Sequence, residues 1–306
     1  MSIDMSIAIE QLRYIRLGTR DLDVAARFAE RELGLQAVAS SADEVAFRSD
    51  ERQYTLVYAK GAPAQQAIGL EVRDIAALEA AIEALRAHGV AATRDDATAV
   101  RRNARALAAF DTPGGLHVEL LVRPQNQAWR FFPQRDAGVT GLAAVAIRST
   151  AIAADEALWT QVFGARIGDW AGDSVYLGFD AAHHRLALHP APRPGVLAVE
   201  FEVDGINAVM RQFHRLREEA QTIMHGPGRR PTSEQVFVSF SGPDEVLYGF
   251  VAEGRSLAQE ERHRPRQFAQ QPASYCSWGS ECRIAEFQDQ AQGAPARAVL
   301  REVTRS

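Results

Sequence analysis

Side chains that could move protons and bind anionic groups are concentrated in two short stretches. The first is the adjacent pair His183 and His184, and the second is the stretch HGPGRR, from His225 to Arg230. A free imidazole has a pKa of about 6.5, which suits general acid or base catalysis near neutral pH. A guanidinium has a fixed positive charge and parallel donors that suit a carboxylate, a phenolate or an enolate. Both stretches are therefore candidates for a site that acts on a small anionic or enolisable molecule.

Each candidate also has a purely structural interpretation. Adjacent residues on a strand point to opposite faces, so we expect one ring of His183 and His184 to face a pocket and the other to face away. An Arg–Arg pair such as Arg229 and Arg230 is often solvated on a loop, and His225 in the same stretch has the same ambiguity.

An internal repeat at an offset of 130 residues supplies the elements that must position these side chains. In each copy an alternating apolar strand passes into helical spacing and ends near a glycine, Gly34 or Gly164. The offset is 131 for the pair 68–72 and 199–203, and we expect a helix after each of these two segments, over 75–88 and 206–220. The paired segments are 12–35 with 142–165, 53–59 with 183–189, 68–72 with 199–203, and 110–122 with 240–252.

This order of elements predicts an α+β fold, with tandem βαβββ-type modules that form paired curved mixed sheets and carry their helices outside. The concave side of such a sheet is the natural ligand pocket. We place an N-terminal domain at residues 1–135 and a C-terminal domain with the pocket at 136–256. Residues 257–306 have poor apolar periodicity and are expected to form an arm that packs on the body or on a neighbouring subunit.

Composition argues against several classes of function. A net charge of -5 argues against nucleic acid as the main partner. No apolar run approaches the roughly 20 residues that span a membrane, and the first ten residues lack the basic region of a signal peptide. The two cysteines, Cys276 and Cys282, lie in the arm and indicate reduced thiols rather than a disulfide framework. We therefore expect a cytoplasmic protein.

The stretch GPGRRPTSEQVFVSFSGPDEVLYGF at 226–250, with HHRLAL at 183–188, resembles the catalytic module of the vicinal oxygen chelate superfamily, which includes glyoxalases and bleomycin-resistance proteins. The two-module arrangement over 10–256 is similar to that of type I extradiol ring-cleavage dioxygenases. The resemblance implies that the second module should hold Fe(II) or Mn(II) through two histidines and one glutamate, with open positions for a catecholate and O2. It also implies a homo-oligomer.

The positions that the resemblance assigns to the metal ligands carry side chains that cannot bind a metal. They are Ala144, Ala198 and Gly249. None of the eight histidines stands at these positions. In the first module only one of the equivalent residues is a possible ligand, and we interpret it as a strand residue left by duplication. These equivalents are Tyr14, Ala67 and Glu119.

The resemblance aligns His184 with a histidine that handles substrate protons, and Arg230 with the position of a further pocket histidine. Our first hypothesis is a metal-free pocket for a small phenolic or enolisable aromatic compound, with His184 as the catalytic residue and Arg230, His225 and His183 as binding residues. The second is a non-catalytic aromatic-binding or resistance-type protein. The third is a metal-dependent extradiol dioxygenase with Fe(II) or Mn(II) on displaced ligands such as His183, His184 and His225. The first two hypotheses need no cofactor.

Overall fold

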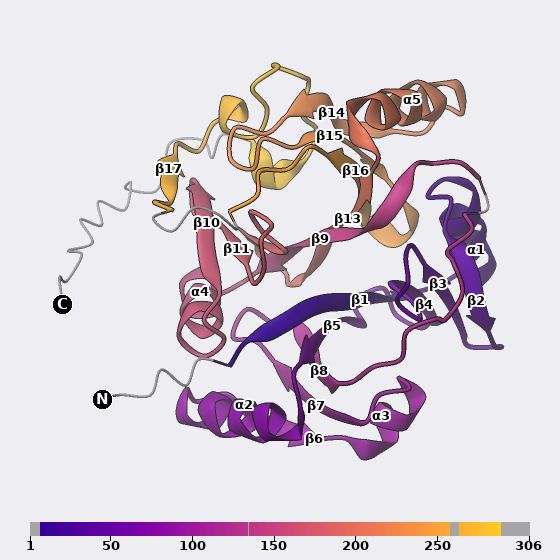
Figure 1. The fold of residues 1–306 in the computed structure, drawn as a ribbon. Helices are drawn as coiled ribbons and strands as arrows, with labels where there is room; N and C mark the ends of the chain where they lie inside the picture. The colour runs from indigo at the N-terminus through magenta and orange to yellow at the C-terminus, as the bar shows by residue number, and fades with distance from the viewer. Residues whose placement is uncertain (1–6, 134, 258–262, 289–306) are drawn as a thin grey trace.

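The chain forms two large mixed β-sheets, one from each copy of the sequence repeat (Figure 1). The computed structural model describes residues 7–133, 135–257 and 263–288. Five α-helices flank the sheets in the described part of the chain, so the predicted α+β fold of tandem modules is confirmed.

The first sheet has eight strands in the order β2-β3-β4-β1-β5-β8-β7-β6. Its two central strands are antiparallel, and each pairs in parallel with the last strand of its own unit, β1 with β4 and β5 with β8. The sheet therefore consists of two βαβββ units side by side. Its strands are β1 (Ile9–Thr19), β2 (Gln36–Ser40), β3 (Glu44–Arg48), β4 (Leu56–Lys60), β5 (Gln66–Val72), β6 (Ala92–Arg94), β7 (Ala106–Asp111) and β8 (His117–Val122).

The second sheet repeats this topology and gains one strand from the arm. Its order is β14-β15-β16-β13-β9-β12-β11-β10-β17. The central strands β9 and β13 are again antiparallel to each other. The strands are β9 (Val139–Ser149), β10 (Arg166–Ala171), β11 (Ser174–Gly178), β12 (Leu186–Pro190), β13 (Gly195–Val203), β14 (Ile223–Arg229), β15 (Val236–Ser241), β16 (Leu247–Ala252) and β17 (Arg266–Phe268).

The helices begin where the sequence supplies N-terminal caps or turns. The side chain of Asp21 accepts a hydrogen bond from the amide of Val24 at 2.9 Å, and that of Asp74 accepts one from Ala77 at 2.8 Å. The helices are α1 (Leu22–Arg31), α2 (Ile75–Ala87), α3 (Asp96–Arg101), α4 (Ile152–Gln161) and α5 (Gly205–Glu218). None of the helices in the described ranges is long and apolar enough to cross a membrane.

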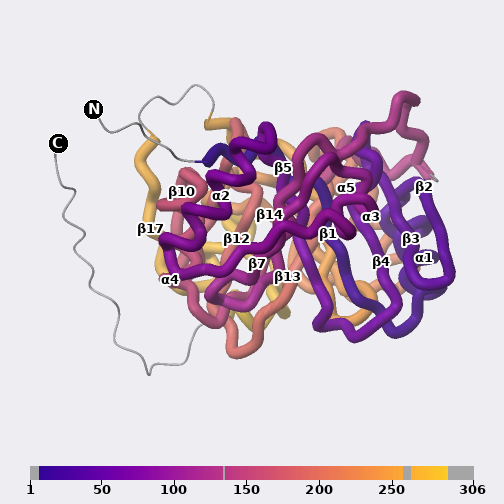
Figure 2. The backbone as a smooth tube through the Cα atoms, turned by 90° about the horizontal axis from the view of Figure 1, so that it is seen from below, coloured from indigo at the N-terminus to yellow at the C-terminus, as the bar shows by residue number. Residues whose placement is uncertain are grey.

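The two modules share one hydrophobic core. Phe28 of α1 reaches across to Tyr248 of β16, with ring centroids 4.8 Å apart, and the hydroxyl of Tyr248 lies 2.6 Å from that of Tyr58. At the other end of the molecule, Trp159 of α4 packs near Phe110 of the first sheet. Figure 2 shows α1 and α4 at opposite ends of this assembly. Each sheet is thus held by its partner as well as by its own helices.

Candidate binding site in the second module

The three positions assigned to metal ligands lie together on three adjacent strands, with a carboxylate between them. In the strand register, Glu200 of β13 pairs with Ala144 of β9 on one side and with Gly249 of β16 on the other. Ala198 lies two residues before Glu200 on β13, on the same face. The nearest atom to a Cβ built on Gly249 is Cγ of Glu200, at 3.5 Å. Glu200 therefore occupies the space that the small residues leave.

The carboxylate of Glu200 is paired with the guanidinium of Arg230. Nη1 of Arg230 donates to Oε2 of Glu200 at 2.9 Å, Nη2 donates to the other oxygen, and Nη1 also reaches Oε1 of Gln235 at 3.0 Å. The side chains are only 6% and 13% exposed. Burial alone would lower the pKa of Arg230, but the charge of Glu200 outweighs this and raises it. Arg230 lines the pocket, as we predicted from its sequence position. Both of its terminal nitrogens, however, already donate to Glu200.

These side chains do not fit a metal ion. Alanine and glycine offer no ligand, and both oxygens of Glu200 already accept hydrogen bonds from Arg230. Within the described ranges, no three His, Cys, Asp or Glu side chains converge in a way that could hold an ion. A borderline divalent metal needs several such ligands on one face.

Only one ring of the pair His183 and His184 lines the pocket, and the two rings contact each other edge-on, with centroids 5.3 Å apart. The strand that we predicted at 183–189 begins only at Leu186, so both histidines lie in the preceding bend, where strand alternation does not apply. Their Nδ1 atoms are 3.1 Å apart, and Nε2 of His183 lies 3.1 Å from Oδ2 of Asp169. His184 lines the pocket, whereas His183 lies behind it.

The buried histidines around the pocket are held neutral near neutral pH. Burial, followed by the charge of Arg230, lowers the pKa of His189 to about 3 and that of His225 to about 4. Burial and then His183 lower the pKa of His184 well below its usual value. His189 lines the pocket and bonds to Ser174 at 2.9 Å. His225, a predicted binding residue, lies outside the pocket lining with its ring 4.8 Å from that of Phe237.

The arm forms part of the wall of the pocket. Its strand β17 pairs in parallel with β10 (Figure 1), and Glu286 of the arm reaches Arg148 of β9 at 2.5 Å. Tyr275 and Phe287 stack on each other, with ring centroids 4.4 Å apart and planes at 7°, and both line the pocket with Ile284. The space left inside is about 30 Å³, room for roughly two water molecules.

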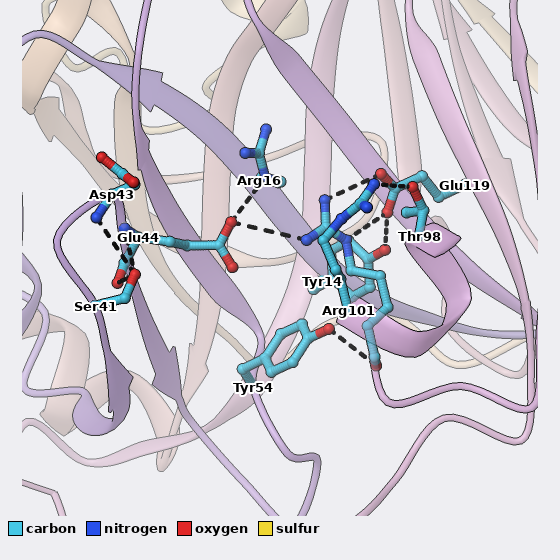
Figure 3. A network of polar contacts seen from close by, with 10 residues as sticks. Tyr14, Arg16, Ser41, Asp43, Glu44, Tyr54, Thr98, Arg101 and Glu119 are labelled. Atoms are coloured by element: carbon cyan, nitrogen blue, oxygen red, sulfur yellow. Dashed lines mark hydrogen bonds and ion pairs between the residues drawn. The ribbon is translucent and has the colours of Figure 1, made fainter. Parts of the chain in front are cut away.

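The first module fills its equivalent site from within. Figure 3 shows Tyr14 and Glu119 in one polar network. Arg102 donates to both oxygens of Glu119, at 2.9 and 3.2 Å, and the hydroxyl of Tyr14 donates to the same carboxylate. Gly69 pairs with both strands here, and a Cβ on it would lie 2.4 Å from the ring of Tyr14. Glu119 is therefore a partner in a buried ion pair, and not only a strand residue left by duplication.

Four groups of side chains in or behind the pocket were not among the residues predicted from the sequence. Glu200, at the centre of the site, could have been found from its i+2 spacing to Ala198 within the strand LAVEFEV. His189 was passed over because no aligned position drew attention to it. Asp169 and the aromatic residues of the arm had no sequence signal, because only the tertiary fold brings them to the pocket.

Comparison with known proteins agrees with this architecture. Residues 11–120 match the sequence model of the Glyoxalase/Bleomycin resistance protein/Dioxygenase superfamily. Over 120 residues the chain is 34% identical to biphenyl-2,3-diol 1,2-dioxygenase from Pseudomonas sp. (strain KKS102), a match that covers 39% of this chain and 41% of that protein. The chain thus matches about two fifths of the length of that relative.

Solved structures share the whole two-module fold. The Mn(II)-bound glyoxalase from Novosphingobium aromaticivorans superposes with a TM-score of 0.81 at 21% identity, over 94% of this chain and 97% of that one. The 2,2',3-trihydroxybiphenyl 1,2-dioxygenase from Sphingomonas wittichii strain RW1 gives 0.77 at 19% identity, over 90% and 100%. The first module thus matches the sequence model of the Glyoxalase/Bleomycin resistance protein/Dioxygenase superfamily, and the chain as a whole shares its fold with these two solved structures.

Proposed function

We propose that the second module binds a small phenolic or enolisable aromatic compound without a metal ion, and that His184 accepts the hydrogen bond or the proton of its hydroxyl. The observation that carries this proposal is the Arg230–Glu200 ion pair, which lies among Ala144, Ala198 and Gly249 where the resemblance places a metal. The charge of this guanidinium is balanced by Glu200, so a bound hydroxyl is expected to depend on His184 as its acceptor.

His184 is suited to accept rather than to donate. Its ring is neutral because burial lowers its pKa, and Nδ1 is engaged by His183, so Nε2 is the ring nitrogen left for the pocket. A histidine with a lowered pKa is a weak base, so proton transfer requires a hydroxyl much more acidic than that of phenol or a simple enol. For less acidic phenols we expect a hydrogen bond without transfer.

The arm indicates what kind of ligand suits the pocket. The stacked rings of Tyr275 and Phe287 line it, and so does Tyr176, whose ring centroid is 5.1 Å from that of His184. The remaining 30 Å³ is far smaller than the roughly 300 Å³ or more of ordinary ligand pockets. We therefore propose that an aromatic ligand enters by displacing Phe287 and stacks in its place.

A non-catalytic binding protein is the second candidate. It is favoured by the charge balance of the pocket, because Arg230 is neutralised by Glu200 and the histidines are neutral. The two candidates share one binding mode and differ only in turnover.

A metal-dependent dioxygenase with displaced ligands has less support. His183 is engaged by Asp169 and His184, and His225 does not line the pocket.

The test is a titration of the full chain with 4-nitrophenol, followed by the absorbance of its phenolate, with and without EDTA. We expect saturable binding that EDTA does not change. The variant Ala198→Leu should abolish binding because Ala198 faces the cavity, whereas Ala37→Leu on the exposed face of β2 should leave it unchanged. Binding that EDTA abolishes, or that survives in Ala198→Leu, would contradict the proposal.

A further inference from the structure

A buried chain of hydrogen bonds leads from the arm to the pocket. Arg266 of the arm binds the carboxylate of Asp169, Oδ2 of Asp169 lies 3.1 Å from Nε2 of His183, and Nδ1 of His183 lies 3.1 Å from Nδ1 of His184. Asp169, His183 and His184 are 0%, 2% and 4% exposed. Buried polar groups in such a chain must each be satisfied, so the position of every proton is constrained.

The number of protons in this chain follows from the surroundings. Asp169 is ionised, since its hydrogen bonds from His183 and Arg266 outweigh burial and lower its pKa. His183 is neutral near neutral pH, because burial lowers its pKa more than Asp169 raises it, with His263 and Arg266 also lowering it. A neutral imidazole carries one ring proton, and a carboxylate can only accept.

The proton positions then follow in order. The carboxylate of Asp169 accepts from Nε2 of His183, so Nδ1 of His183 has no proton and must accept in turn. The only donor for it in this contact is Nδ1 of His184.

We propose that Asp169 and His183 are positioning residues that hold His184 in the tautomer with its proton on Nδ1 and its Nε2 lone pair available to the pocket. This inference rests on the proposed function and assigns to it two residues that do not touch the ligand. It also supplies a path for the proton. When the O–H bond of a ligand breaks and Nε2–H forms, the proton on Nδ1 of His184 can pass to Nδ1 of His183. The positive charge then lies beside Asp169.

Arg266 fixes which oxygen of Asp169 faces His183. Its backbone amide donates to Oδ1 at 2.6 Å, its Nε donates to Oδ1 at 3.2 Å, and its Nη2 donates to Oδ2 at 2.7 Å. An asparagine at 169 would keep its oxygen at the position of Oδ1, where the backbone amide and Nε of Arg266 both donate, and Nη2 of Arg266 would keep its hydrogen bonds to the carbonyls of Pro231 and Thr232. The NH2 group of the asparagine would then replace Oδ2 and would donate to Nε2 of His183.

The variant Asp169→Asn should therefore reverse the donor and acceptor roles in the hydrogen bonds that link residue 169, His183 and His184. His183 would carry its proton on Nδ1, Nδ1 of His184 would become the acceptor, and the proton of His184 would move to Nε2. The ring that accepts a ligand proton would become a ring that donates one. Asp180→Asn is the matched control, because Asp180 accepts from the amide of Ala182 just before the histidine pair but touches neither ring.

The experiment is two-dimensional NMR of the ring nitrogens in the full chain labelled with ¹⁵N-histidine, without ligand, with His184→Gln to assign the signals. We expect His184 in the wild-type protein and in Asp180→Asn to be protonated on Nδ1 alone, and in Asp169→Asn on Nε2 alone. An Nε2–H tautomer or an exchanging mixture in the wild-type protein would overturn the proposal, as would an unchanged tautomer in a folded Asp169→Asn. The wild-type spectrum decides even if the variant does not fold.

This readout is independent of ligand binding. The predicted tautomers in a protein that binds no phenol would leave the relay intact and refute the proposed function. Phenol binding with the opposite tautomer would refute the relay alone.

Discussion

Removing one partner of the Glu200–Arg230 ion pair should lower the free energy of unfolding more than removing both partners. The two side chains are 6% and 13% exposed, so either one left alone would be a buried charge without a partner. Removing one partner of such a pair destabilises a protein by about 3–5 kcal/mol, whereas replacing both with apolar groups of similar volume is near neutral or stabilising by about 1–4 kcal/mol. We therefore expect Glu200→Leu and Arg230→Met each to lower the free energy of unfolding by about 3–5 kcal/mol. The double variant should recover most of this loss.

The measurement is equilibrium unfolding in urea, followed by circular dichroism, with the four proteins combined in a double-mutant cycle. The matched control is the pair Glu83 and Arg86 on α2, with the same two substitutions. Its side chains are 69% and 65% exposed and lie 2.6 Å apart. Exposed pairs contribute about 0–1 kcal/mol. A coupling energy for Glu200 and Arg230 as small as that of the control would refute the view that this ion pair holds the centre of the second sheet.

Three further predictions follow from the same contacts. Burial lowers the pKa of His225 to about 4, against about 6.5 in an unfolded chain. Between these two pH values the unfolded state binds more protons than the folded state. The free energy of unfolding should therefore fall as the pH falls from about 6.5 to about 4. In His225→Phe the slope of unfolding free energy against pH should shrink by about one proton over this range, and an unchanged slope would count against the assignment. Phe287→Ala should raise the affinity for 4-nitrophenol by about tenfold or more, because the ligand would no longer have to displace a phenyl ring. Burying an aromatic side chain stabilises by about 1.5–3 kcal/mol, and about 1.4 kcal/mol corresponds to a tenfold change in affinity. An equal or weaker affinity by titration would contradict displacement of the arm. Arg102→Met should cost about 3–5 kcal/mol in urea unfolding, because it leaves Glu119 unpaired, but should not change phenol affinity, and a lost affinity would place a functional site in the first module.

The fold was predictable because the repeat displays it twice. Alternation in strands such as LAVEFEV and helical spacing after Asp74 carry local signals, and the offset of about 130 residues brings the two copies into alignment. The small side chains at Ala144, Ala198 and Gly249, the positions that the resemblance assigns to metal ligands, can also be read directly from the sequence. Tyr248, which is adjacent to Gly249 on β16, lies in the core, as strand alternation requires.

The chemistry that replaces those ligands was not predictable in the same way. Glu200 becomes central only through the register that places it between Ala144 and Gly249, and one residue of slip would point it away. The bend at His183 and His184 departs from the strand pattern because β12 begins two residues later, at Leu186. The predicted homo-oligomer and the cytoplasmic location remain predictions.

The arm illustrates a different limit. Its sequence has no periodicity that indicates a partner, and its contacts depend on single side chains that meet β9, β10 and each other. Such contacts are specified by the finished surface of the second module. We expected the arm to pack on the body or on a neighbour. The structure places its described part, residues 263–288, on the pocket of its own chain.

The most direct test of a metal-free pocket is the iron content of the purified chain after anaerobic reconstitution with Fe(II), combined with oxygen uptake in the presence of catechol. We predict well below one equivalent of tightly bound iron and no catechol-dependent oxygen uptake, because both oxygens of Glu200, which lies between Ala144 and Gly249, already accept hydrogen bonds from Arg230. Near-stoichiometric iron together with ring cleavage would contradict it. The chain would then be a dioxygenase with a different set of ligands.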